Sequence, residues 1–389
     1  MSAANLMQRL TRDLGVVWPN HEQDQVLQAI FAPPQQALAA FAAWRGELDI
    51  AHDFDRALMR LLPLLYLRML DIGQQDPLMG RLKGVYRRAW SDTQAMFHGT
   101  APALAALRAA GIDTMLLKGA PMVLFHYRNH GSRPMADLDI AVCFTDAEAA
   151  FRALAGAGWQ AQTPITRDDL AFRHARPFRG PGGHEIDLHW HMLFETVCAD
   201  ADALFWHHVQ PATLRDVATT CLTPTLTLLH TLAHGLRPNT ETPVRWIADA
   251  LTLLRDPTAP IDWPLFCQTA AALGLSYRML LGLAYLRDHY GQDIPTATSQ
   301  ALGAARRGPA EALELAVITR RTGWHRPVAI DRGLLVTAEF CRLARQRSPL
   351  AAAAMLPDFV RYRLGIASWR GAAHGALRRI NRRPRPASG

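Results

Sequence analysis

The chain has 389 residues, of which 49% are hydrophobic and 20% are charged. This ordinary globular composition excludes a wholly disordered, collagen-like or coiled-coil chain, and the length favours two to three domains. No apolar run reaches the roughly 18 residues of a membrane-spanning helix, and the first residues contain no hydrophobic signal segment. The five cysteines form no CxxC pair, which indicates reduced thiols. We therefore expect a cytoplasmic protein.

The net charge of +8 comes from 42 basic and 34 acidic residues. A basic excess is typical of nucleic-acid binding, but over half of this excess lies in five arginines near the C-terminus: Arg378, Arg379, Arg382, Arg383 and Arg385. Prolines accompany them and aromatic residues do not, so we expect residues 376–389 to form a disordered basic tail. A nucleic-acid partner is not favoured. The chain contains only two lysines, Lys83 and Lys118.

Helical periodicity covers residues 1–110 almost throughout. The last of these helices is expected to end at Gly111, because glycine commonly follows a helix C-terminus. From residue 111 the pattern changes, and short apolar runs alternate with helical ones. The expected strands cover residues 114–117, 137–142, 171–178 and 185–190, and the expected helices cover 121–128 and 146–154. The last two strands flank a GPGG turn at 180–183, which predicts a hairpin.

This order of elements predicts an α+β fold with four regions. Residues 1–110 form an N-terminal helical region, and residues 111–215 form a small mixed-sheet α/β core. Residues 216–375 form a C-terminal helical domain without a fixed-period repeat, and residues 376–389 form the basic tail.

The strongest chemical signal is the run MADLDIAV, which contains Asp137 and Asp139. Residues two apart on a strand share a face, so the two carboxylates are expected to project together while Leu138 and Ile140 point to the other side. Like charges on one face repel unless a cation lies between them. A divalent metal such as Mg²⁺ suits an aspartate site that keeps open positions for phosphate. The alternative is a solvated DxD pair on an exposed strand.

Two further runs favour the metal. In GHEIDLHWH the same alternation places Asp187 on one face, where it supplies a third carboxylate if the two strands are neighbours. In LLKGAP, Lys118 and Gly119 lie between an apolar strand and a helix start. Free N–H groups at such a start bind anions, glycine allows a phosphate to approach closely, and the lysine adds a positive charge.

With these motifs the sequence resembles the nucleotidyltransferases of the polymerase-β-like superfamily, in particular a bacterial group of uncharacterised members with helical flanks. The resemblance lies in LLKG (116–119), DLDIAV (137–142) and EIDLHW (185–190), and more loosely in HTLAH (230–234) and RWIADALTLL (245–254). The usual superfamily turn before the DxD motif is Gly-Ser or Gly-Gly, whereas this chain has Lys-Gly-Ala.

The resemblance implies a nucleotidyltransferase-like core and two-metal catalysis. Asp137 and Asp139 hold two Mg²⁺ or Mn²⁺ ions and the triphosphate of an NTP such as ATP, and Asp187 binds the metal that activates a hydroxyl acceptor. Attack on the α-phosphorus then releases pyrophosphate. Lys118, Gly119 and Arg133 are expected to bind the phosphates, and Arg133 has a solvated loop position as its alternative.

The sequence does not decide the roles of several histidines. His189 and His191 are either metal ligands, donors that orient the carboxylates, or part of a polar strand face. His230 and His234 share a helix face and are expected to be core or interface residues. Arg245 and Asp249 are expected to form an ion pair four residues apart on one helix. An inactive nucleotide- or protein-binding scaffold and a metal-dependent phosphohydrolase are the alternatives to a transferase. The base, the acceptor and the oligomeric state are not readable from the sequence.

Overall fold

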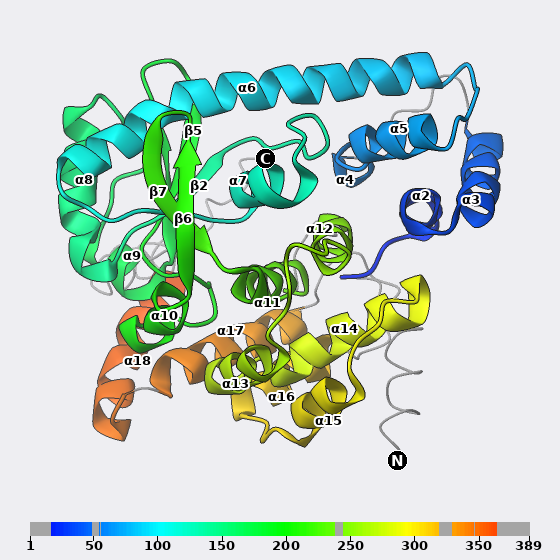
Figure 1. The fold of residues 1–389 in the computed structure, drawn as a ribbon. Coiled ribbons are helices and arrows are strands. Elements are labelled where there is room, and N and C mark those ends of the chain that lie inside the picture. Colours follow the sequence, from blue (N-terminus) through cyan, green and yellow to red (C-terminus); the bar gives the residue numbers. More distant parts are fainter. Residues whose placement is uncertain are drawn as a thin grey trace, which may run out of the picture.

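A mixed sheet is covered by helices that come from both ends of the chain (Figure 1). This computed structural model describes residues 17–48, 54, 56–237, 244–318, 329–345 and 347–363. The tail at 376–389 lies outside the described residues. None of the described helices has the length and apolar character that crossing a membrane requires.

The N-terminal region is helical, as predicted. Its described helices are α2 (His21–Phe31), α3 (Pro34–Glu47), α4 (Arg56–Met59), α5 (Leu62–Asp71) and α6 (Met79–Ala109). A capping box of Asn20 and Gln23 begins α2. The long helix α6 runs along the top of Figure 1 and contacts α8 and strands β2, β5 and β7. Its C-terminus at Ala109 lies close to the expected stop at Gly111.

The sheet has seven strands in the described part of the chain. They are β1 (Met115–Leu116), β2 (Leu138–Ala141), β3 (Gln160–Ala161), β4 (Ala175–Arg179), β5 (Glu185–His189), β6 (Val209–Leu214) and β7 (Val217–Leu222). Their order is β3-β4-β5-β2-β1-β7-β6. The pairs β2–β5 and β1–β7 are parallel, and the other neighbours are antiparallel. This mixed sheet and its helices confirm the α+β fold.

Short helices connect the strands. They are α7 (Gly119–Pro121) with the π-helix that continues it (Met122–Tyr127), a 3₁₀ turn (Phe144–Asp146), α8 (Ala147–Gly156), α9 (Arg167–Phe172) and α10 (Ala199–Trp206). The expected β4–β5 hairpin is present. The strand expected from residue 171 was placed too early, because a capping box of Thr166 and Asp169 begins α9 there.

The hairpin of β6 and β7 did not stand out in the sequence. It extends the sheet to Leu222, beyond residue 215, where the core was expected to end, because β7 pairs with β1. The division of the chain at residues 110, 215 and 375 stays a prediction.

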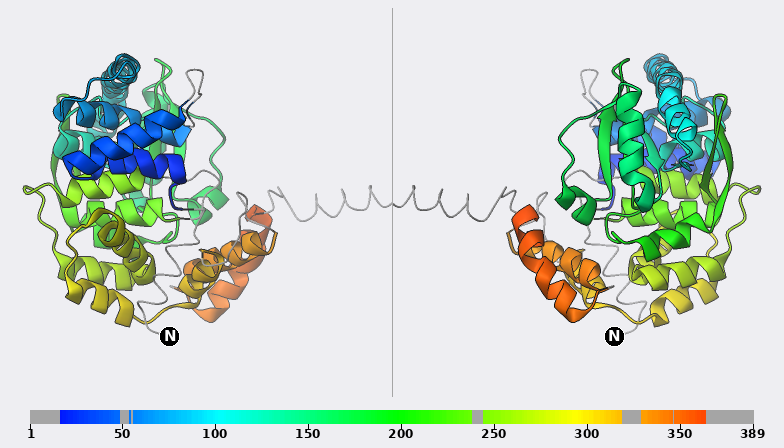
Figure 2. Two further views of the ribbon diagram at one scale, coloured as in Figure 1. Left: turned by 90° about the vertical axis from the view of Figure 1, so that its right-hand side faces the viewer. Right: turned by 90° about the vertical axis from the view of Figure 1, so that its left-hand side faces the viewer.

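The C-terminal helices are α11 (Pro224–Gly235), α12 (Arg245–Leu254), α13 (Trp263–Leu273), α14 (Ser276–Tyr290), α15 (Thr296–Ala304), α16 (Pro309–Ile318), α17 (Ala329–Ala344) and α18 (Pro349–Arg363). Figure 2 shows α17 and α18 in orange at one side of the molecule. There α18 contacts α9 of the sheet region.

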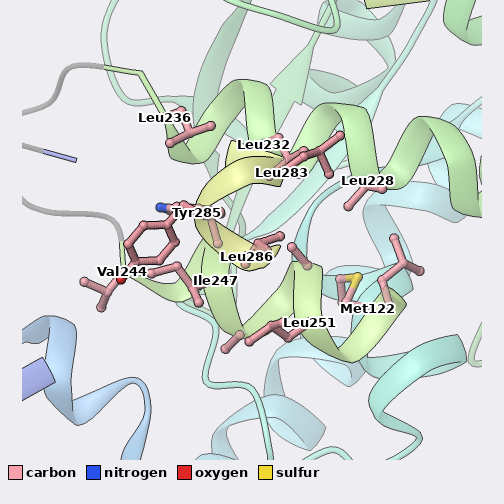
Figure 3. Packing of buried hydrophobic residues seen from close by; sticks show 14 of the residues in the cluster. Met122, Leu228, Leu232, Leu236, Val244, Ile247, Leu251, Leu283, Tyr285 and Leu286 are labelled. Carbon is pink, nitrogen blue, oxygen red and sulfur yellow. The ribbon is translucent and has the colours of Figure 1, made fainter. Parts of the chain in front are cut away.

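One hydrophobic cluster holds α11, α12 and α14 together (Figure 3). Leu228 and Leu232 from α11 face Ile247 and Leu251 from α12 and Leu286 from α14. Close packing also requires Gly235 at the end of α11, because any Cβ there would overlap the side chain of Trp246. The cluster extends to side chains of α2 and α5. The α11–α12 pair is therefore fixed against the rest of the protein, and it forms one wall of the site described below.

Candidate functional site

Two carboxylates meet on neighbouring strands. Strands β2 and β5 run parallel with Asp139 beside Asp187. The leucine and isoleucine that flank each aspartate along its strand are fully buried. Ligand atoms of Asp139, Asp187 and His189 all lie within 4.8 Å of one another. The expected neighbouring strands are thus present, and they bring two predicted aspartates together with a histidine.

Asp137, the first aspartate of the DxD motif, lies just before β2 and is exposed. It lines the same pocket as Asp139. Partial burial raises the pKa of Asp137, and the carboxylate of Asp139 raises it further. It is not one of the three groups whose ligand atoms converge, so it stands at the edge of the group of possible metal ligands.

Lys118 places its ammonium against the buried carboxylate. Its Nζ lies 2.5 Å from Asp139 Oδ1 and 3.5 Å from His189 Nε2. Burial alone lowers the pKa of Lys118, but Asp139 and Asp187 outweigh it and the pKa is raised. Burial alone raises the pKa of Asp139, yet Lys118 and His189 hold it far below its usual range. Asp139 is therefore ionised and already has a cation beside it.

The turn at Lys118 and Gly119 is strained and tightly packed. Lys118 has φ 51° and ψ −107°, a sparsely populated conformation for a residue with a Cβ. A Cβ on Gly119 would overlap Met135 and the Nη1 of Arg133. The glycine is thus needed for the approach of these two side chains. Its expected contact with a phosphate stays a prediction.

Arg133 is buried rather than solvated. Only 6% of it is exposed. Its guanidinium donates two hydrogen bonds to Asp249 of α12, from Nε to Oδ1 at 2.9 Å and from Nη2 to Oδ2 at 2.8 Å. The Tyr127 hydroxyl donates to the same Asp249 at 3.0 Å. The alternative of a solvated loop arginine is wrong, and so is the expected Arg245–Asp249 pair. Arg245 instead donates from Nη1 to the Pro134 carbonyl at 2.5 Å.

The histidines have different surroundings. His189 is fully buried, with Nε2 3.0 Å from Asp139 Oδ1 and 3.3 Å from Asp187 Oδ2. Burial and Lys118 lower its pKa, but the two carboxylates outweigh them and the pKa is raised. Its Nδ1 has no hydrogen-bond partner among the described residues. His191 instead binds Asp202 of α10, with Nδ1 2.6 Å from Oδ2, so the two histidines do not act as a pair.

His230 and His234 of α11 belong to the wall of the pocket. His230 Nε2 lies 3.1 Å from the Met192 carbonyl, and burial lowers its pKa to about 4. Burial also holds the pKa of His234 well below its usual value. Both imidazoles are neutral at pH 7, and both face the pocket. The expectation of satisfied core or interface histidines holds for His230, which in addition lines the site.

A pocket of about 250 Å³ lies between the sheet and the helices. Its sheet-side lining includes Lys118, Gly119, Arg133, Asp137 and Asp139, and its helical lining includes Arg60, His230, Thr231, His234, Arg245, Trp246 and Asp249. Arg60 and Thr231 were not singled out from the sequence, where an isolated arginine or threonine on a helix carries no signal. A larger cavity of about 510 Å³, between α10, α13, α16 and α17, contains none of the predicted site residues.

Comparison with known proteins points to one family. A search of curated proteins finds no match. One solved structure with some likeness is an antigenic nucleotidyltransferase-like protein from Paracoccidioides brasiliensis, with a TM-score of 0.33 and 16% identity over 55% of this chain and 94% of that chain. That likeness is too low to carry chemistry from one protein to the other. The profile of the uncharacterised nucleotidyltransferase family matches residues 57–291, which is more than half of the chain and includes the whole pocket lining. The chain therefore belongs to the uncharacterised nucleotidyltransferase family.

Proposed function

We propose that the protein transfers a nucleoside monophosphate from an NTP to a hydroxyl group of a small molecule, a glycan precursor or a protein. The observation that carries this proposal is the pairing of Asp139 with Asp187 beside a pocket lined by four cationic side chains. The family membership supports the same chemistry. In the reaction, the acceptor oxygen bonds to the α-phosphorus, the bond between the α- and β-phosphates breaks, and pyrophosphate and a proton leave.

The family implies a divalent metal, and the residues present fit one. Asp139, Asp187 and His189 offer two carboxylates and one imidazole whose ligand atoms lie within 4.8 Å of one another. Asp137 supplies a further carboxylate from the edge of the pocket. Oxygen ligands suit Mg²⁺, and an imidazole in the set makes Mn²⁺ a good alternative. When bound, such an ion polarises the phosphate and makes the acceptor hydroxyl more acidic.

The protein's own groups position the reactants. Lys118 and Arg133 place positive charge beside the phosphates, where negative charge grows in the transition state. The neutral His230 and His234 line the helical wall, where they are able to accept or donate hydrogen bonds to an acceptor. None of the five cysteines, all of which lie in the described part of the chain, forms a disulfide, which fits the cytoplasmic location that we also propose.

The test is release of pyrophosphate from labelled NTPs in the presence of Mg²⁺ or Mn²⁺. We expect release by the wild type, loss of it in Asp139→Asn, and retention in Asp92→Asn, an exposed carboxylate on α6 paired only loosely with Arg88. Release that survives Asp139→Asn contradicts the proposal. Free phosphate as the product in place of pyrophosphate identifies a phosphohydrolase.

One contact favours a second candidate, an inactive scaffold that binds a nucleotide. The Lys118 ammonium lies 2.5 Å from Asp139 Oδ1 and so neutralises a carboxylate that a metal would use. A protein that had replaced its metal by a lysine would bind NTP without a metal. Calorimetry separates the two: NTP binding that EDTA leaves unchanged, with no turnover, supports the scaffold and contradicts the transferase.

A further inference from the structure

We propose that Arg60, Arg133 and Arg245 form a polyphosphate-binding subsite in the pocket, where the start of α12 meets the segment that carries Arg133. Its ligand class is a chain of linked phosphates. The identification of that chain with the β- and γ-phosphates of an NTP rests on the proposed function, whereas the subsite itself rests on the charges described below.

The charges that line the pocket do not cancel locally. Four cationic side chains line it, and three carboxylates accompany them: Arg60, Lys118, Arg133 and Arg245 with Asp137, Asp139 and Asp249. Lys118 pairs with Asp139, and Arg133 pairs with Asp249. Among the described residues no carboxylate forms an ion pair with Arg60 or Arg245, although Asp137 interacts with Arg245 through space. The helical lining has two arginines and one carboxylate, Asp249, and so carries an excess of positive charge.

Arg245 is the centre of this excess. Its Nη1 donates to the Pro134 carbonyl, and among the described residues no carboxylate forms an ion pair with it. Burial, together with the neighbouring Arg133 and Arg60, lowers the pKa of Arg245 to about 9, and Asp249 only partly offsets this. Like charges held together inside a protein are costly unless a counter-charge joins them. A bound polyanion supplies that counter-charge.

The guanidinium of Arg133 has one nitrogen, Nη1, that Asp249 does not engage and that lies at the pocket wall near Gly119. Asp249 engages its Nε and Nη2, while its Nη1 lies against Gly119 in the pocket wall. The ion pair fixes the plane of the guanidinium, so the remaining donors are oriented before a ligand arrives. Guanidinium groups bind phosphate oxygens through paired, charge-assisted hydrogen bonds.

The start of α12 adds to this field. The helix begins at Arg245, has ten residues and carries no side-chain cap. Val244, Arg245 and Trp246 all line the pocket. The first N–H groups of a helix and the positive end of its dipole favour anions, so backbone and side chains act in the same direction here.

The sheet lining and the helical lining therefore define an orientation for the ligand. The α-phosphate lies beside Asp139, and the phosphates that leave as pyrophosphate lie beside Arg60 and Arg245. Positively charged arginines beside the leaving pyrophosphate stabilise the transition state as the bond between the α- and β-phosphates breaks.

The experiment measures binding of inorganic tripolyphosphate to the full chain by calorimetry, in EDTA, so that no metal contributes. We expect Arg60→Gln and Arg245→Gln each to weaken binding by about tenfold, the effect of losing one hydrogen bond from a charged donor. Arg88→Gln removes the same charge from an exposed face of α6 and should leave the affinity within about twofold. Arg60 is exposed, so its variant reports on the subsite even if Arg245→Gln fails to fold.

Two outcomes overturn the inference. One is the absence of tripolyphosphate binding by the wild type. The other is equal binding by the wild type and the Arg60→Gln/Arg245→Gln double variant, which would assign the anion to other arginines such as those at 378–385. Failure of the proposed function is a separate result: tripolyphosphate binding that depends on Arg60 and Arg245, together with no pyrophosphate release from any NTP, keeps the subsite and rejects the transferase.

Discussion

Two buried ion clusters in this protein have similar contacts and different surroundings. The open cluster, Lys118, Asp139, Asp187 and His189, lies beside the pocket, and two of its members line it. The closed cluster, Glu195, Arg278, Glu314 and Arg342, joins the end of the sheet region to the C-terminal helices. There Arg278 contacts Glu195 at 2.6 Å and Glu314 at 2.8 Å, and Arg342 contacts Glu314 at 2.7 Å.

Burial and short ion pairs therefore do not by themselves mark a functional site. In the closed cluster, Arg278 lies between two carboxylates and lines neither cavity, and Arg342 is the one member that lines the larger cavity. In the open cluster, Asp139 lines the pocket together with Lys118, which has a strained backbone conformation. We expect the closed cluster to govern stability and the open cluster to govern ligand binding and turnover.

The largest effect is expected for Arg278→Met. Removing the cation leaves Glu195 buried without its ion-pair partner and leaves Glu314 with Arg342 alone, and breaking a buried pair typically costs about 3 to 5 kcal/mol of unfolding free energy. Denaturant unfolding measures the loss, and Arg88→Met on the exposed face of α6 is the control, with a change of about 0.5 kcal/mol or less. Activity per folded molecule should be unchanged. Reduced activity in the folded variant would show that the closed cluster also affects turnover.

For Asp139→Asn we expect the opposite pattern. Pyrophosphate release should fall by about 100-fold or more, equivalent to roughly 3 kcal/mol of transition-state stabilisation. Stability should change less than in Arg278→Met, because the Lys118 side chain is 21% exposed and its ammonium can turn toward water. Steady-state kinetics and denaturant unfolding on the same sample check both expectations. A destabilisation as large as that of Arg278→Met would show that the open cluster is also structural.

Lys118→Met tests whether the lysine competes with a metal. The ammonium lies against Asp139 and Asp187, so its removal should strengthen Mn²⁺ binding by about tenfold, since one opposing charge is worth about 1 to 2 kcal/mol at this range. Calorimetry with Mn²⁺ alone measures this. Lys83→Met, which removes the other lysine of the chain from an exposed position on α6, is the matched control. Unchanged or weaker Mn²⁺ binding contradicts the competition.

The smallest effect concerns Glu339, a buried carboxylate of α17 near the closed cluster. Burial raises its pKa to about 7, and Arg363, its ion-pair partner, only partly offsets this. A raised pKa means that the folded state binds the proton more tightly, so stability is highest below about pH 4.5 and falls as the pH rises to about 7. We expect the unfolding free energy of Glu339→Gln not to fall over this pH range and to exceed that of the wild type by about 1 kcal/mol at pH 8. Urea unfolding at pH 5 and pH 8 checks it, and equal pH dependence of both proteins contradicts it.

Much of the sheet side of the site was readable from the sequence because its signals are local. The alternation of DLDIAV and EIDLHW indicates strands and the shared face of their carboxylates, and the Lys-Gly turn follows an apolar run. The structure has these strands as parallel neighbours with Asp139 beside Asp187. His189 was left open because alternation alone does not say which residues after Asp187 stay on the strand. The strand ends at His189, so His191 follows a different path toward Asp202.

The helical side was not readable, because its contacts join distant parts of the chain. Asp249 is four residues from Arg245, and local spacing favoured that pair. In the structure, Asp249 instead accepts hydrogen bonds from Arg133 and Tyr127. Arg60, which follows α4, and Arg245, the first residue of α12, line the same pocket although they lie far apart in the sequence. The β6–β7 hairpin was missed for a related reason: β7 is specified by its pairing with β1 and not by a strong pattern of its own.

The parallel register of β2 and β5 has a consequence for how the protein is assembled. A shift of one residue in either strand would turn its carboxylate toward the apolar layer and bring a leucine or isoleucine to the pocket side. A shift of one residue in one strand separates the two aspartates, and α8, β3, α9 and β4 lie between these strands in the sequence, so their pairing is a long-range contact. At the proposed metal site, the amount of metal bound should therefore report the fraction of correctly paired molecules, and its recovery during refolding should follow the slow, long-range step of folding rather than the early formation of helices.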